Sequence, residues 1–302
     1  MDPLLNHAAG LLAFVRTVET GSFSAAARAT GTSPSAVSRS VARLERRLGT
    51  RLFNRSTRAL APTAEGRAWF ERVAPLLRAL ADSAEAAGPP GEISGTLRVS
   101  LPGDLARLLI GPLTSGLMRA HPGLGLELSF ADRRVDVVRE GFDLAVRVGR
   151  PEDSELTARP LGRLRMVLVA APALLARHGR PADRAALAAL PFVRYMRGGR
   201  TQPVSFATGP TLEPRGPLAL DAGHAIRSAA LHGAGAALLM RCVVAEDIAA
   251  GTLEPLLPDD PLPDMPVTGL HAFGRLAPRR LRAFCDVLEA EFARLDPPGG
   301  GA

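Results

Sequence analysis

A stretch near the amino terminus, PSAVSRSVARLERRL, places apolar and polar side chains on opposite sides of one predicted helix. Spacing of four, three and four residues puts aliphatic side chains on one face: Val37, Val41, Leu44 and Leu48. The other face collects hydroxyl and guanidinium groups: Ser35, Ser38, Arg39, Arg43 and Arg46. We therefore predict a helix that packs on its own domain through one face and leaves the other face free to enter a groove.

The residues around this helix define its ends and two helices before it. Ser33 is a good N-cap, Pro34 suits the first helical position because its missing N–H costs nothing there, and Gly49 ends the helix. Ahead of it, an Ala-rich helix over residues 23–29 follows an amphipathic helix that ends at Gly21. Three helices joined by short turns are thus predicted for the first part of the chain.

A small β-hairpin is predicted over residues 51–63, and it carries Arg55 and Arg58. The segment from Arg39 to Arg58 holds seven Arg and one acidic residue, Glu45, although the net charge of the whole chain is only +7. Such a concentration of positive charge indicates a surface that meets phosphate groups. The alternative is an ordinary solvated helix face.

A long helix is predicted over residues 64–87, with Thr63 as its cap. Its apolar residues keep a near-heptad spacing: Trp69, Val73, Leu76, Leu80, Ala84 and Ala87. This spacing is typical of a helix that pairs with a partner, and Pro75 should kink it. The segment GPPGEISG, residues 88–95, is predicted to be a hinge.

From Thr96 onward the pattern changes to alternating strands and helices. The first strand candidates are TLRVSLP, GLELSFAD and FDLAVRVG, with helical stretches near residues 104–120 and 132–140. The second set is RMVLVAAP, PFVRYM, GPLALDAG and GAALLM. Because LRVSLP and MVLVAAP each end at a Pro before a helix, we predict two similar α/β lobes.

Length and composition exclude several other classes of protein. The 302 residues suffice for about two folded domains, and an apolar share of 46% is that of a globular chain. The first residues lack a basic leader and no run approaches the ~20 apolar residues of a membrane span, so we expect a cytoplasmic protein. Cys242 and Cys285 do not make a disulfide framework; a redox-sensing thiol pair is the alternative.

The segment ETGSFSAAARATGTSPSAVSRSVARLERRLGTRLFNRSTRALAPTAEGRAWF strongly resembles LysR-type transcriptional regulators. The likeness continues through LRVSLP, VDVVREGFDLAVRVGR, VLVAAPALLARHGRP and AALHGAGAALL, and so covers nearly the whole chain. It implies an α/β multidomain protein with a winged helix-turn-helix (1–63), a dimerising linker helix (64–87), a hinge (88–95) and an effector domain (96–302). The effector domain would resemble a type 2 periplasmic binding protein. Lobe I would comprise about residues 96–161 and 266–302, the last strand and helix folding back onto it, and lobe II about residues 162–265.

The resemblance also implies partners. LysR-type regulators typically assemble as tetramers built from two dimers, bind paired half-sites in double-stranded DNA upstream of promoters, and respond to small metabolites; RNA polymerase is a further candidate partner. The matching positions for DNA contacts lie on the recognition helix and the wing: Ser33, Pro34, Ser35, Ser38, Arg39, Arg55 and Arg58. Short hydroxyls near a helix N-terminus approach phosphates and base edges closely, and Arg39 can reach a guanine or a phosphate.

By the same resemblance, the effector lies between the lobes, where strand carboxyl ends and helix N-termini meet and backbone N–H groups favour anions. The residues that would face this cleft are Ser100, Pro102, Ser129, Arg147, Tyr195, Met196, Gly223 and His224. Arg147 stands in an otherwise aliphatic strand, and a buried guanidinium needs a partner. That partner is either a carboxylate of the effector or an acidic residue of the protein itself.

Two other functions remain as alternatives. An enzyme is disfavoured because the six His show no metal-ligand spacing and no Ser lies in a nucleophile elbow. GAGAAL, from Gly233, begins like a dinucleotide fingerprint but lacks its third Gly. We therefore expect no metal, no cofactor and no catalytic residue. The second alternative is a ligand-binding protein whose basic segment only mediates assembly.

Overall fold

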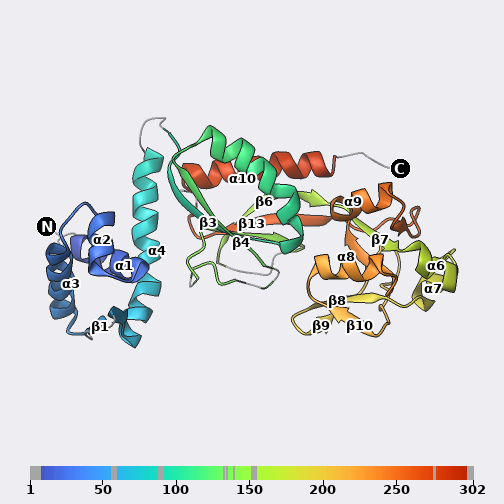
Figure 1. Cartoon of the computed structure of the whole chain (residues 1–302), viewed down its shortest axis with the longest axis horizontal. Coiled ribbons are helices and arrows are strands. Elements are labelled where there is room, and N and C mark those ends of the chain that lie inside the picture. The colour runs from blue at the N-terminus through green and yellow to red at the C-terminus, as the bar shows by residue number, and fades with distance from the viewer. Residues whose placement is uncertain are drawn as a thin grey trace. The chain divides into compact units, whose positions relative to one another are not determined.

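The computed structural model describes residues 8–55, 60–87, 92–131, 133, 135–138, 140–150, 155–274 and 277–297 (Figure 1). By their contacts, the residues up to Ala87 form one unit and most of the residues from Glu92 onward form the other. We call residues 8–87 the amino-terminal unit and residues from 92 onward the carboxy-terminal unit, and describe each by itself. In the described part of the chain, no helix has both the length and the apolar character that a membrane span requires.

The amino-terminal unit consists of helices around one small core and a short hairpin. Its elements are α1 (Ala8–Thr20), α2 (Phe23–Ala29), α3 (Pro34–Leu48), β1 (Phe53–Arg55), β2 (Leu60–Pro62) and α4 (Ala64–Ala87). The Phe14 ring lies at the centre, with its centroid 5.6 Å from those of Phe53 and Trp69. Val41, fully buried on α3, belongs to the same core. The first half of α4 therefore folds with the three preceding helices.

Local capping explains why these helices begin and end where the sequence predicts. The amide of Ala25 donates to the hydroxyl of Ser22 (3.1 Å), and the amide of Gly66 donates to that of Thr63 (2.9 Å). Gly49 ends α3 with a φ of 67°, a left-handed conformation that glycine adopts without strain. The predicted N-caps Ser33 of α3 and Thr63 of α4 and the predicted C-cap Gly49 of α3 are confirmed.

Three leucines of this unit lie outside its core. Leu48 was expected in the apolar stripe of α3, and this expectation is wrong: the residue is 40% exposed. It lies in the last turn of α3, one turn beyond Leu44, where the core ends. On α4, Leu76 and Leu80 are 70% and 65% exposed, so the near-heptad stripe continues past the core into solvent.

The carboxy-terminal unit begins with a five-stranded sheet in the order β4-β3-β5-β13-β6. The strands are β3 (Gly95–Leu101), β4 (Leu124–Phe130), β5 (Leu144–Val148), β6 (Thr157–Leu164) and β13 (Met265–His271). β3 pairs in parallel with β4 and β5, whereas β13 pairs antiparallel with β5 and β6. We call this sheet and its helices lobe I. The predicted return of the last strand to lobe I is confirmed.

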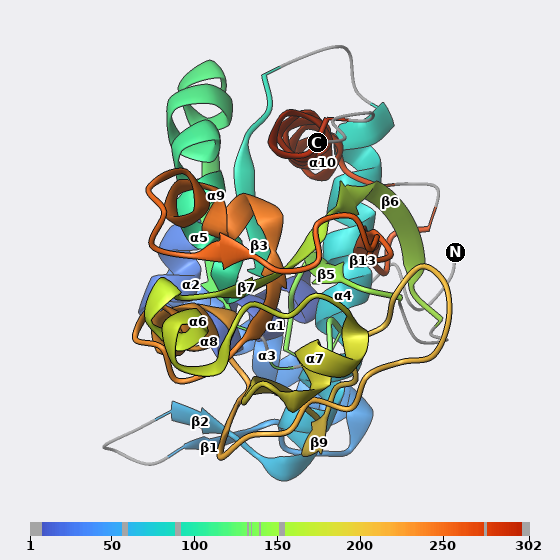
Figure 2. The same cartoon turned by 90° about the vertical axis from the view of Figure 1, so that its right-hand side faces the viewer.

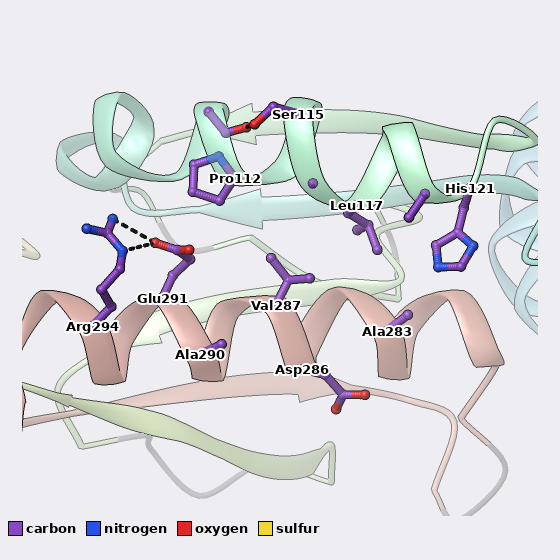
Figure 3. A pocket seen from close by; sticks show the side chains of 13 residues that line it. Pro112, Ser115, Leu117, His121, Ala283, Asp286, Val287, Ala290, Glu291 and Arg294 are labelled. Carbon is purple, nitrogen blue, oxygen red and sulfur yellow. Dashed lines mark hydrogen bonds and ion pairs between the residues drawn. The ribbon is translucent and has the colours of Figure 1, made fainter.

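Helices cover this sheet. After β3 come η2 (Gly103–Leu105), α5 (Ala106–Gly111) and the π-helical η3 (Pro112–Met118); α10 (Arg279–Leu295) lies beside them (Figures 1 and 3). The prediction of a helix near residues 132–140 is wrong, because the residues described there form turns, a bend and irregular backbone. Charged side chains interrupt the apolar spacing there, and Gly141, with a φ of 69°, closes the turn.

Lobe II contains two three-stranded sheets, in the orders β11-β7-β12 and β10-β8-β9. Their strands are β7 (Met166–Ala170), β8 (Val193–Arg197), β9 (Arg200–Thr201), β10 (Leu218–Leu220), β11 (Ala237–Met240) and β12 (Glu254–Pro255). The helices are α6 (Pro172–His178), α7 (Arg184–Ala189), α8 (Gly223–Leu231) and α9 (Arg241–Ala249), seen from a second direction in Figure 2. All four strands predicted for this region are confirmed; β6, β9 and β12 were not predicted.

Candidate functional site

The exposed side of α3 carries the residues that the sequence singles out. Ser33, Pro34, Ser35 and Arg39 are exposed, and Ser38 is partly buried. Arg43 and Arg46 extend the same exposed side. We call these seven residues the basic face of α3. Val37, Val41 and Leu44 on the opposite side are at most 4% exposed, so the two-sided character of this helix is present in the structure.

Hydrogen bonds fix the first turn of α3. The Ser33 hydroxyl accepts from the amide of Ala36 (3.2 Å) and lies 3.1 Å from the Ser35 hydroxyl. Two hydroxyls thus stand together at the positive end of a helix, where a phosphate is favoured. Arg39 is one turn further along, so its guanidinium reaches outward from the same surface.

The hairpin after α3 is attached to that helix by Glu45. The carboxylate Oε1 of Glu45 accepts from the amides of Leu52 (2.8 Å) and Phe53 (3.1 Å), at the start of β1. In β1, Arg55 pairs with Leu60 of β2. The side chain of Arg55 and the whole of Arg58 lie outside the described part of the structure. Glu45, the one acidic residue of the basic segment, therefore positions the hairpin.

In the carboxy-terminal unit, two adjoining cavities lie where the lobes meet. The inner cavity, of about 150 Å³, is lined by residues of both lobes, among them Pro102, Arg147, Tyr195 and Gly223. The outer cavity, of about 970 Å³, is lined by Tyr195, Met196 and His224 among others. Because Ala131, Tyr195 and Arg197 line both, the two cavities form one cleft. Six of the eight residues predicted for the effector site are thus brought together.

Ser100 and Ser129 line neither cavity. They face each other in register on β3 and β4, and Ser100 is fully buried. Its hydroxyl accepts a hydrogen bond from Nη2 of Arg147 (3.1 Å), while Nη1 donates to the carbonyl of Val146 (2.7 Å). Ser100 thus holds the guanidinium of Arg147 at the wall of the inner cavity.

Among the residues that the structure describes, the charged side chains that line the cleft are mostly basic. Arg133, Arg150 and Arg197 line the outer cavity and are exposed, and Arg147 lines the inner one. Two carboxylates accompany these four guanidinium groups: Asp221 in the outer cavity and Asp104 in the inner one. This excess of positive charge favours a negatively charged ligand.

Sequence reasoning missed Arg133, Arg150, Arg197 and Asp104. A signal for Asp104 was present, because it comes directly after Pro102 and Gly103 at the carboxyl end of a strand, where ligands bind in α/β folds. Arg133 and Arg150 follow strand ends and Arg197 is the last residue of β8, but an exposed Arg at such a position is too common to mark a site.

A third cavity, of about 810 Å³, lies between η3 and α10 (Figure 3). Small and apolar side chains line much of it, including Pro112, Leu117 and Val287. The guanidinium group of Arg294 forms an ion pair with the carboxylate of Glu291 on the same helix, at 2.8 Å. None of the predicted effector residues lines this third cavity, so we do not assign it to the effector. Among the described residues, no group of three or more His, Cys, Asp or Glu could hold a metal ion.

Comparison with known proteins identifies both units. Residues 9–67 match the family model described as "Bacterial regulatory helix-turn-helix protein, lysR family", and residues 90–293 match "LysR substrate binding domain". The chain belongs to the LysR family of transcriptional regulators. Within that family, the regulator CrgA of Neisseria meningitidis serogroup C is 34% identical over 290 residues, which are 93% of this chain and 95% of CrgA.

Other LysR-family relatives show the same extent of similarity. PtxR of Pseudomonas aeruginosa is 34% identical over 297 residues, 96% of this chain and 93% of PtxR. The solved structure of Neisseria meningitidis CrgA has a TM-score of 0.61 at 32% identity, covering 94% of this chain and 98% of that one. The full-length structure of the Vibrio cholerae virulence activator AphB has a TM-score of 0.54 at 27% identity, covering 93% and 98%. As a LysR-type regulator, this protein pairs a helix-turn-helix DNA-binding domain with an effector-binding domain.

Proposed function

We propose that the basic face of α3 reads operator DNA and that the cleft between the lobes binds a small anionic effector that controls this binding. One observation carries the proposal: α3 buries Val37, Val41 and Leu44 while Ser35 and Arg39 stay exposed on the opposite side. A helix of this kind inserts into the major groove without disturbing the core of its own domain.

In this proposal the basic face of α3 and the hairpin contact different parts of the DNA. Ser33, Pro34, Ser35 and Ser38 approach the backbone and base edges at the start of the helix, while Arg39 forms a bidentate contact with a guanine. The wing residues Arg55 and Arg58 contact the phosphate backbone or the minor groove. The attachment of the hairpin through Glu45 supports this arrangement, because it fixes the start of β1 relative to α3.

The effector binds with its acidic group on Arg147. The hydrogen bond from Arg147 to the buried hydroxyl of Ser100 supports this role, since it holds the guanidinium in place before a ligand arrives. Pro102, Tyr195 and Gly223 line the space beside it, and Met196 and His224 line the outer cavity. Ser129 contributes through its neighbour Ser100 on the paired strand.

The protein assembles through α4 into a dimer, and two dimers form a tetramer. The exposed leucines Leu76 and Leu80 support this, because a helix rarely leaves two large apolar side chains of one stripe in water. It acts in the cytoplasm, with RNA polymerase as a further partner at the promoter. No catalytic role is proposed, because its relatives are named as transcriptional regulators.

The test is binding of the full chain to the DNA upstream of its own gene. A regulator binds this DNA more tightly than a random duplex of equal length, with an association constant that falls steeply as salt rises. The logarithmic slope is about −0.9 per neutralised phosphate. A ligand-binding protein whose basic segment serves assembly alone binds neither duplex, and that result would overturn the proposal.

A further inference from the structure

Asp104 of lobe I lies against the first residue of α8 in lobe II. A Cβ atom added to Gly223 would lie 1.8 Å from Oδ2 of Asp104 and 2.6 Å from its Cγ. His224, the next residue of α8, has its Nδ1 3.9 Å from Oδ1. The carboxylate is only 13% exposed. A carboxylate from one lobe therefore occupies the N-terminus of a helix in the other.

The start of α8 has no capping side chain of its own. Its N-cap is Ala222, which carries no polar side-chain atom, and its first turn contains no acidic residue. The amides of a first helical turn favour a nearby negative charge. Asp104 supplies that charge from outside the helix. Gly223 is needed here for space, because any larger side chain would meet the carboxylate.

The rest of the inner cavity offers a different environment. Arg147 lies on its wall, held by Ser100. The other lining residues are largely aliphatic or thioether side chains: Met166, Ile226, Leu238, Leu239, Met240 and Met265. Arg197, which also lines the outer cavity, is the second guanidinium group of this lining. An anion that enters the inner cavity thus meets two guanidinium groups, an apolar wall and a helix end at which a carboxylate already lies.

We propose that Asp104 determines the effector specificity of the cleft by occupying the anion position at the N-terminus of α8. The inference rests on the proposed function of the cleft. It narrows the effector to a small molecule with an acidic group on Arg147, an apolar body in the inner cavity and no acidic group directed at α8. A molecule with a second acidic group directed at α8 is rejected, because that group would meet the carboxylate of Asp104.

The position of the Asp104 carboxylate at the N-terminus of α8 is tested by removing this carboxylate and supplying another from solution. Asp104→Ala removes a carboxylate that formate can replace, since formate together with the alanine methyl group approximates the aspartate side chain. We expect the melting temperature of the full chain to fall by roughly 2–4 °C in the variant. Formate should restore part of this loss, measured against chloride at equal ionic strength, whereas neutral formamide should not.

Three comparisons make the test specific. Formate should raise the melting temperature of Asp104→Ala more than that of the unmodified chain, and we call this difference the excess. The double variant Asp104→Ala with Arg147→Ala should show the same excess over Arg147→Ala alone. The control is Asp259→Ala, at an exposed aspartate of lobe II, which should show no excess. An equal response of Asp104→Ala and the unmodified chain, or loss of the excess with Arg147→Ala, would overturn the proposal.

A second measurement covers the case in which Asp104→Ala does not fold. Asp104→Asn keeps the size of the side chain, so Gly223→Ala should still lower the melting temperature in that background, while formate finds no room and has no effect. A formate response in Asp104→Asn would contradict the assigned position. These experiments use neither DNA nor an effector. They can therefore fail while the chain still binds its operator, and they can succeed in a cleft that binds no effector.

Discussion

The hydroxyl of Ser33 accepts a hydrogen bond from the amide of Ala36, 3.2 Å away, and so sets the first residue of α3. The same hydroxyl lies 3.1 Å from that of Ser35, on the exposed side of the helix. One residue thus serves both the stability of the helix and the surface proposed to meet DNA. The two roles can be separated by substitution.

Ser33→Ala removes the cap and should lower the free energy of unfolding by about 0.5–2 kcal/mol. Ser33→Asp keeps a capping oxygen but adds negative charge, so its stability should match the unmodified chain while its DNA affinity falls. Chemical denaturation gives the first quantity and fluorescence anisotropy with upstream DNA gives the second. Unchanged DNA affinity in Ser33→Asp would remove Ser33 from the DNA contact.

Replacing both exposed leucines of α4, Leu76→Ser with Leu80→Ser, should break the dimer without unfolding the amino-terminal unit. Leu76 and Leu80 are exposed in the single chain, so we expect their apolar surface to be buried only against another copy of the chain. Light scattering coupled to size exclusion reports the molar mass. Leu12→Ser, at an exposed leucine of α1, is the control and should keep the mass. An unchanged mass in the double variant would assign assembly to another surface.

Arg147→Met should abolish binding of small carboxylates in the cleft, since the apolar replacement keeps much of the side-chain volume but loses the charge. The measurement is the rise in melting temperature of the full chain across a series of monocarboxylates. Arg180→Met changes a lobe II surface arginine that pairs with Glu254, and it should bind like the unmodified chain. Equal responses of Arg147→Met and the unmodified chain, with lower stability of Arg147→Met, would make Arg147 structural.

The two thiols should not react in the folded protein. Burial raises the pKa of the Cys285 thiol to about 12 and that of Cys242 to about 11. At pH 8 the thiolate, which is the reactive form, is then only about 0.01% and 0.1% of each group. A disulfide reagent should therefore label both residues in denaturant and neither in the native chain. Rapid native labelling would support the redox-sensing alternative.

Elements that are fixed by contacts between residues close in sequence could be predicted from the sequence, whereas elements fixed by distant contacts could not. The amino-terminal helices were predicted closely because Ser33, Pro34 and Gly49 act within one or two turns of their own positions. β6 was missed because Arg, Pro and Gly interrupt its apolar pattern and its partner β13 lies far along the chain. β9 and β12 were missed because each has only two residues.

The same reasoning applies to the cleft. Arg147 was found because a guanidinium is unusual in a strand of Ala, Val and Leu, a property visible locally. The role of Asp104 depends on Gly223, which belongs to the other lobe, and no local pattern connects the two. Leu48 fits the helical spacing of its stripe, yet only the three-dimensional extent of the core shows that it lies beyond that core.

The central claim, that the exposed side of α3 reads base sequence, is tested most directly by Arg39→Ala. The measurement is the ratio of dissociation constants for random and upstream DNA, compared with the same ratio for Arg72→Ala, which removes an exposed arginine of α4. If Arg39 makes a bidentate base contact, its loss costs about 1–3 kcal/mol of specific binding, and the ratio should fall roughly 5- to 150-fold. Arg72→Ala should leave the ratio unchanged. An equal loss of affinity for both duplexes in Arg39→Ala would contradict the claim and make Arg39 a contact to the backbone alone.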